Sequence, residues 1–141
     1  VYKRQLGLSQ LSKLKKFVRR RSVLVKLYDK LLAPLAPSLR PVTRMPGGQP
    51  AWHLYQILID FENLGVSRAT LMRKLLDKDI GTQVHYIPVH LQPYYQRLYG
   101  KQYLPGVERF YKSCLSLPLF PGMLDSDVRQ VTKSIEALIS D

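Results

Sequence analysis

Polar rings gather in one short stretch of the sequence. The segment GTQVHYIPVHLQPYY, Gly81 to Tyr95, holds two of the three histidines together with three tyrosines and two prolines. Near neutral pH a histidine can donate and accept hydrogen bonds, and tyrosine hydroxyls can bind the oxygens of a sugar or a phosphate. The stretch is therefore a candidate binding site for an oxygen-rich ligand.

The order of residues in this stretch separates its two histidines. Alternation over residues 82–86 predicts a strand with one polar face and one packed face. The polar face would carry Gln83 and His85, and the packed face Val84 and Tyr86. We interpret His85 as a structural histidine whose hydrogen bonds are met by the fold.

A loop is predicted after this strand. Pro88 restricts the residue before it to extended geometry and ends regular pairing, so residues 88–93 should form an irregular loop. The loop presents His90 and Gln92 near a strand end, where binding sites often lie. A ligand contact and a structural role remain equally open for His90, and the neighbouring tyrosines fit half-buried packing with hydrated hydroxyls as well.

Nothing else in the sequence completes a catalytic apparatus. The histidines lack carboxylates at the spacing of a metal-ligand set. No glycine-rich loop precedes a helix as a phosphate site requires, and no serine lies in a nucleophile elbow. His53, beside Trp52 in a predicted strand, is interpreted as structural. The candidate residues therefore indicate part of a site rather than a whole one.

Length and composition indicate one folded domain. The chain has 141 residues, 45% of them hydrophobic, which is enough to bury a core and excludes a fully disordered protein. No apolar run is long enough to cross a membrane and no signal-peptide pattern opens the chain, so we expect a cytosolic (cytoplasmic) protein. Cys114 is the only cysteine, which excludes a disulfide within the chain and predicts a buried, unreactive thiol.

Positive charge is concentrated near the start of the chain. Residues 1–50 hold 12 Lys and Arg against one acid, a net +11, whereas residues 51–141 hold 10 against 9, a net +1. Apolar residues over 8–32 recur at three- and four-residue steps, which predicts an amphipathic helix with a solvated basic face. The alternative is a free-standing basic module that binds nucleic acid or an anionic membrane through this helix, although no aromatic residues interleave with the basic run.

Shorter elements are predicted after the helix. Prolines and glycines between residues 33 and 51 indicate a connector with a short extended piece at 39–42. A strand is expected over residues 51–59, followed by a helix that Ser67 caps and that ends near Lys78. This order predicts an α/β fold class. Further helices are expected at residues 94–99, 105–113 and 125–140.

Two segments resemble a known family. GTQVHYIPVHLQPYY (81–95) and PGVERFYKSCLSLPLFPGMLDSDVRQV (105–131) closely resemble the C-terminal domain of sugar-nucleotide aminotransferases of the DegT/DnrJ/EryC1/StrS class, which are fold-type-I enzymes dependent on pyridoxal phosphate. LGLSQLSKLKKFVRRR (6–21) is similar to the helix that joins their large and small domains. The resemblance implies a long N-terminal helix, a small and mainly antiparallel sheet with flanking helices, and a buried strand and turn at residues 116–123.

The resemblance also implies a reaction and a site. A lysine of such enzymes forms a Schiff base with pyridoxal phosphate, and the amino group of an amino acid such as glutamate passes to a 4-keto sugar nucleotide. We expect a UDP-linked 4-keto-6-deoxy sugar of pseudaminic acid type as substrate and a homodimeric full-length parent, with no nucleic-acid or membrane partner. His90 would contact the sugar, surrounded by Tyr86, Gln92, Tyr94 and Tyr95.

The chain departs from the family pattern in two respects. The catalytic lysine and the cofactor-binding groups of the family match nothing here, so no catalytic, cofactor-binding or metal residue is assigned. We therefore expect the chain alone to be inactive and to bind no pyridoxal phosphate. The first five residues, VYKRQ, fit neither the family nor a natural start. The expected organisation is a non-native junction at 1–5, a linking helix at 6–33, a connector at 34–50 and a small domain at 51–141, without the large domain.

Overall fold

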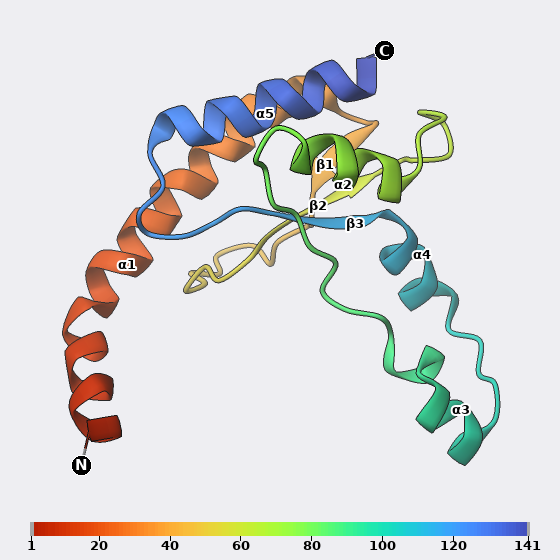
Figure 1. The fold of residues 1–141 in the computed structure, drawn as a ribbon, viewed down its shortest axis with the longest axis horizontal. Helices are drawn as coiled ribbons and strands as arrows, with labels where there is room; N and C mark the ends of the chain where they lie inside the picture. The colour runs from red at the N-terminus through yellow and green to blue at the C-terminus, as the bar shows by residue number, and fades with distance from the viewer. Residues whose placement is uncertain (1, 141) are drawn as a thin grey trace.

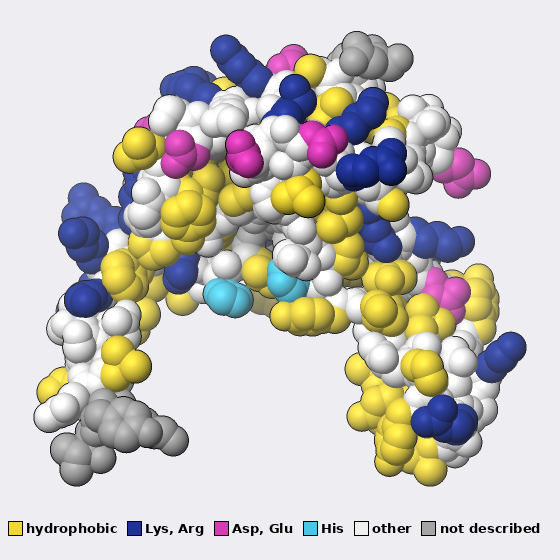
Figure 2. Space-filling view, viewed as in Figure 1, with side chains coloured by type: hydrophobic (Ala, Val, Ile, Leu, Met, Phe, Trp, Pro, Cys, Tyr) yellow, Lys and Arg dark blue, Asp and Glu magenta, His cyan; other side chains and the backbone are white. Residues whose placement is uncertain are grey.

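The chain forms an arch around a small central sheet (Figure 1). The computed structural model describes residues 2–140, and Val1 of the predicted junction lies outside them. The N-terminal part of helix α1 (Tyr2–Leu32) descends on one side of the arch, and the segment that carries helix α3 (Pro93–Tyr99) descends on the other. The space-filling view shows a hollow between these two descending parts (Figure 2).

Helix α1 has two different halves. In its C-terminal half Leu24, Tyr28 and Leu32 are fully buried, and their four-residue spacing places them on one face. In its N-terminal half several leucines are between 47% and 71% exposed, namely Leu6, Leu8, Leu11 and Leu14. The amphipathic helix predicted for residues 8–32 is confirmed, and it continues back to Tyr2.

Three antiparallel strands form the sheet, in the order β1 (Leu39–Pro41), β2 (Tyr55–Ile59) and β3 (Cys114–Leu117). Central strand β2 alternates buried and half-buried residues, so one face of the sheet packs on the core. The antiparallel sheet with flanking helices confirms the expected fold. The extended piece near residue 39 and the buried strand near residue 116 are also confirmed.

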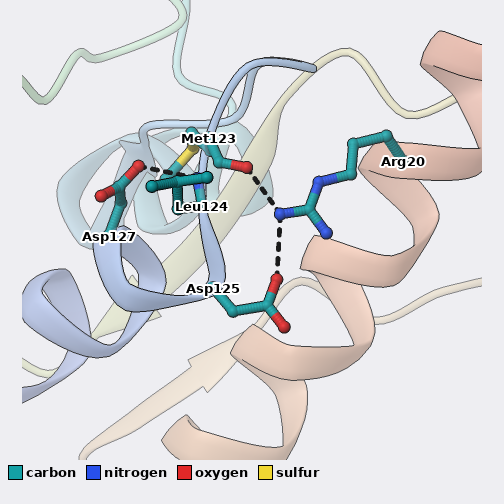
Figure 3. Close-up of polar contacts among 5 residues, drawn as sticks. All are labelled: Arg20, Met123, Leu124, Asp125 and Asp127. Atoms are coloured by element: carbon teal, nitrogen blue, oxygen red, sulfur yellow. Dashed lines mark hydrogen bonds and ion pairs between the residues drawn. The ribbon is translucent and has the colours of Figure 1, made fainter.

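Helix α5 (Asp125–Ser140) packs against α1 and closes the core. At their junction the guanidinium of Arg20 donates hydrogen bonds to the carbonyl oxygen of Met123 at 2.6 Å and to Oδ1 of Asp125 at 2.9 Å (Figure 3). The N–H of Leu124 donates to Oδ2 of Asp127 at 2.8 Å, which satisfies a backbone group that the first helical turn leaves free. Polar contacts thus join the N-terminus of α5 to α1.

The remaining helical segments are short. They are the 3₁₀ turns η1 (Ala33–Leu35) and η2 (Val89–Leu91) and helices α2 (Arg68–Leu76), α3 and α4 (Pro105–Ser113). Ser67 caps α2 as predicted, because its hydroxyl accepts the N–H of Thr70 at 3.0 Å. The helix ends at Leu76 rather than near Lys78. Asp79 then adopts a positive φ of 60°, which aspartate tolerates better than most residues.

The strand predicted at residues 82–86 is wrong. Only Gln83 pairs, through a single antiparallel bridge to Ser116. The carbonyl oxygen of His85 instead accepts a hydrogen bond from the Gln56 side chain at 3.5 Å. Tyr86, predicted to pack, is 76% exposed. Pro88, which has no N–H to donate, cannot extend the pairing further along the chain.

The predicted first strand was too long at its start. Strand β2 begins at Tyr55 rather than at Ala51, so His53 lies in the preceding loop, where it is exposed. Its predicted place in a strand is therefore wrong. Within residues 2–140, none of the helices combines the length and apolar character that crossing a bilayer requires.

Candidate functional site

Histidine side chains lie on the inner surface of the arch, next to the hollow (Figure 2). In the segment that supplies the predicted site, residues 83–113, every residue is half-buried or exposed. Local hydrogen bonds therefore help to hold its polar groups in place.

His90 is held by such a local contact. It lies in turn η2, and its side chain is 7% exposed. Nε2 of His90 lies 3.3 Å from Oε1 of Glu108, at the start of helix α4. The same carboxylate oxygen accepts the N–H of Leu104 at 3.2 Å. One side chain thus joins the histidine turn to the first turn of α4.

A pocket of about 460 Å³ lies beside His90, within the size range of small-molecule sites. Tyr95 and Tyr99 of helix α3 supply its aromatic wall, and Gln102 supplies a polar group. The other lining residues are Pro88, Val89, Gly100, Leu104 and Val107. Apolar walls with a few polar groups are typical of sites that orient a small ligand.

Only one of the four residues predicted to surround His90 lines this pocket. Tyr95 does so. Tyr94 packs edge-on against Tyr95, with ring centroids 5.2 Å apart, and is 62% exposed. Gln92 is half-buried at the start of α3, and Tyr86 lies apart from the pocket lining. The structure therefore brings His90 and Tyr95 together, and the other three residues do not line the pocket.

His85 has a separate anchor. Its Nδ1 lies 2.9 Å from Oγ of Ser116, a buried residue of β3. The ring of Tyr86 packs edge-on against the imidazole, with centroids 4.7 Å apart. A histidine whose ring nitrogen is met by a buried hydroxyl fits the structural interpretation of His85.

Glu108, Ser116 and Tyr99 are not among the residues predicted to form the site. Glu108 follows His90 by 18 residues, and Ser116 follows its partner histidine by 31. A proline followed by an acid at residues 105–108 signals a helix start. No sequence signal showed that this carboxylate reaches back to a histidine, because the contact depends on how the loop folds.

A second polar cluster joins helix α1, the connector after β1 and strand β2. Asp29 accepts two hydrogen bonds of 2.6 Å from Arg44 and one of 2.8 Å from the hydroxyl of Tyr55. The hydrogen bond with Asp29 raises the pKa of Arg44, and burial raises the pKa of Tyr55. The guanidinium also lies 4.6 Å above the ring of Trp52. Since these charges satisfy one another, we interpret the cluster as structural.

The cysteine and the acids do not add a further reactive centre. Cys114 is buried as predicted, and burial raises the pKa of its thiol. Within the described part of the chain, no three His, Cys, Asp or Glu side chains converge as metal ligands would. The pocket at His90, which is lined by two of the predicted site residues, is therefore taken as the candidate site.

Three proteins illustrate what the chain is similar to. The spore coat polysaccharide biosynthesis protein SpsC of Bacillus subtilis is 36% identical over 137 residues, which are 95% of this chain and 35% of that protein. The aminotransferase TlmJ of Streptoalloteichus hindustanus superposes with a TM-score of 0.82 at 32% identity, over 95% of this chain and 35% of its own. PseC of Helicobacter pylori, an aminotransferase involved in the biosynthesis of pseudoaminic acid, gives 0.87 at 27%, over 96% and 36%.

The similarity covers nearly the whole of this chain but only part of its relatives. The chain spans about a third of the length of the curated proteins it matches. The model of the DegT/DnrJ/EryC1/StrS aminotransferase family matches residues 4–136, a range that includes the His90 pocket. The chain belongs to the DegT/DnrJ/EryC1/StrS aminotransferase family.

Proposed function

We propose that the chain is the C-terminal part of a pyridoxal-phosphate-dependent aminotransferase that passes an amino group from an amino acid, with glutamate expected, to a UDP-linked 4-keto-6-deoxy sugar. The nearest named activity is that of UDP-4-amino-4,6-dideoxy-N-acetyl-beta-L-altrosamine transaminase, in the biosynthesis of pseudaminic acid. The family match over residues 4–136 carries this proposal. The likeness to PseC supports the pseudaminic acid assignment, and the likeness to SpsC supports a role in polysaccharide biosynthesis.

His90 is the residue that we assign to the sugar. Its ring is enclosed beside a pocket with two tyrosines, Tyr95 and Tyr99, and such rings pack against the apolar faces of a sugar while their hydroxyls bind its oxygens. Tyr86, Gln92 and Tyr94 do not line the pocket, and we propose that they contact a substrate that extends beyond it. The role of this chain is to bind and orient the sugar.

The residues that line the His90 pocket do not fit pyridoxal phosphate. A site for this cofactor needs a lysine amine for its aldehyde and cations or backbone N–H groups for its phosphate. No lysine or arginine is found among the residues of the described chain that line the His90 pocket. We therefore propose that another part of the full-length protein, a cytoplasmic homodimer, holds the cofactor, and that this chain alone neither binds it covalently nor transaminates.

The exposed half of α1 supports a larger parent. Leu8 and Leu11 are 71% and 64% exposed, which is unusual for leucines on an amphipathic helix whose other half is buried. A large domain packed on this half would remove these side chains from water. This large domain would then lie beside the hollow of the arch.

The source DNA upstream of the codon for Leu6 tests the proposal. We expect an open frame that encodes a large domain, and we expect the encoded protein to bind pyridoxal phosphate through a lysine of that domain. Borohydride reduction followed by peptide mapping identifies the lysine. A frame that stops just ahead of Leu6, or a reduced cofactor attached to this chain, would contradict it.

A basic groove favours a second candidate function. Lys15, Lys16, Arg19 and Arg20 line a groove of about 650 Å³ between α1 and the turn at Pro121 and Gly122. A free-standing module could bind nucleic acid or an anionic membrane there. Binding to DNA or to vesicles with anionic lipid that weakens steeply with salt, and that Lys15→Glu abolishes, would support this function. Binding with an affinity that does not depend on salt concentration would contradict this function.

A further inference from the structure

Glu108 is placed to control the chemistry of His90. Its Oε1 lies 3.3 Å from Nε2 of the imidazole, and an ionised carboxylate can only accept hydrogen bonds. The neutral imidazole must therefore carry its proton on Nε2 to make this contact. Which ring nitrogen of a histidine holds the proton is set by the hydrogen bonds that the two ring nitrogens make.

The carboxylate is itself held in place. Oε1 also accepts the backbone N–H of Leu104 at 3.2 Å, just ahead of helix α4, and Glu108 lies in the first turn of that helix. A negative charge there is favoured by the helix dipole. Because the acceptor is fixed by the backbone, the ring that it binds is fixed as well.

Burial of the His90 side chain increases the importance of its contact with Glu108. The side chain is only 7% exposed, so little water is available to replace the carboxylate. Within residues 2–140, Glu108 is the one side chain that hydrogen-bonds the imidazole. Without it, the ring would lose both its orientation and its preference for one tautomer.

We propose that Glu108 is a positioning residue that holds His90 as the Nε2-protonated tautomer, which leaves Nδ1 to accept a hydrogen bond from a hydroxyl group of the substrate. The identity of the substrate as a sugar rests on the proposed function, whereas the positioning role does not. The pocket would accordingly select a ligand that presents a hydroxyl donor to His90 rather than one that presents only acceptors.

Nitrogen NMR of the histidine rings tests the positioning role directly. In the 141-residue chain with ¹⁵N-labelled histidine, at mildly alkaline pH, we expect the two ring nitrogens of His90 to show the Nε2–H pattern. In Glu108→Ala we expect their shifts to move toward each other, because both tautomers are populated. Glu108→Gln should restore the wild-type pattern if its amide oxygen faces the ring.

Two controls separate positioning from folding. Glu136→Ala, at an exposed position on α5, removes the same charge without touching His90 and should leave the ring signals unchanged. Far-ultraviolet circular dichroism shows whether each variant remains folded. An unchanged Nε2–H pattern in folded Glu108→Ala, or an Nδ1–H pattern in the wild-type chain, would overturn the proposal.

The full-length protein adds a functional measurement. Glu108→Ala should raise the KM for the sugar substrate while the reaction with the amino donor keeps its rate, and Glu108→Gln should recover most of the loss. If the His90 ring signals change in Glu108→Ala but the full-length protein does not transaminate a sugar, the positioning role is supported and the proposed function is contradicted. If sugar transamination occurs and the His90 ring signals are the same in Glu108→Ala as in the wild type, only the positioning role is contradicted.

Discussion

The rings of Tyr28 and Tyr55 stack with centroids 4.6 Å apart, and this contact joins helix α1 to the central strand of the sheet. The hydroxyl of Tyr28 donates to the carbonyl oxygen of Pro118 at 3.0 Å, and that of Tyr55 donates to Oδ1 of Asp29 at 2.8 Å. Both phenols are thus buried, neutral and hydrogen-bonded, and the C-terminal half of α1 is part of the core rather than an attached linker.

The tyrosine pair predicts a loss of stability in alkali. Burial raises the pKa of both hydroxyls, whereas an unfolded tyrosine ionises near pH 10. The contribution to the free energy of unfolding is therefore complete below about pH 10 and falls as the pH rises further. Urea titrations at several pH values should show this fall. In Tyr28→Phe the fall should be shallower, and in Tyr103→Phe, at an exposed position, it should match the wild type.

The contact of Arg20 with the start of α5 predicts a measurable stability loss. Arg20→Ala removes hydrogen bonds to Met123 and Asp125 and should lower the free energy of unfolding by about 1–2 kcal/mol. Asp125→Ala should cost less than about 1 kcal/mol, because that carboxylate is largely exposed and exposed ion pairs are weak. Arg19→Ala, one position away on exposed surface, is the control. Equal stability of all three variants in urea would show that the junction contributes nothing.

The exposed leucines of α1 predict self-association of the chain. Leu8→Glu and Leu11→Glu should lower the sedimentation coefficient and raise the monomer fraction, because both side chains are more than half exposed and an apolar stripe in water favours association. Ser9→Glu and Ser12→Glu add the same charge to the same part of the helix and should change the association much less. A chain that is monomeric before any substitution would contradict the prediction.

His90 predicts a difference between the two halves of the transamination reaction. In the full-length enzyme His90→Ala should slow the step that consumes the sugar about 10- to 100-fold, as expected for one lost hydrogen bond of about 1–3 kcal/mol. The step that consumes the amino donor should change little. Stopped-flow spectra of the cofactor follow each half separately, with His53→Ala as a control at an exposed loop position. Equal losses of rate in both half-reactions would show that His90 does not act specifically on the sugar.

Local signals explain the parts of the fold that the sequence predicted. The hydroxyl of Ser67 and the proline at position 105 mark helix starts by their own chemistry. The apolar spacing of α1 likewise depends only on residues within that helix. These elements appear where the sequence placed them.

Contacts between distant segments explain the parts that the sequence missed. The alternation over residues 82–86 would suit a strand, but only Gln83 finds a partner on the edge of β3, and alternation cannot show how much of an edge is free. The link from His90 to Glu108 depends on the path of an irregular loop, which has no periodic signal. The sequence could therefore single out His90 as a candidate, but it could not indicate its partner Glu108 or the second tyrosine of the pocket wall, Tyr99.

The fate of a labelled amino group tests the assignment of this chain to a sugar-nucleotide aminotransferase. The full-length protein, supplied with ¹⁵N-glutamate and a UDP-linked 4-keto-6-deoxy sugar, should yield a sugar nucleotide that carries the label at carbon 4, as mass spectrometry of the product would show. Transfer of the label to other keto acids, with the sugar unlabelled, would contradict the assignment of this chain to a sugar-nucleotide aminotransferase.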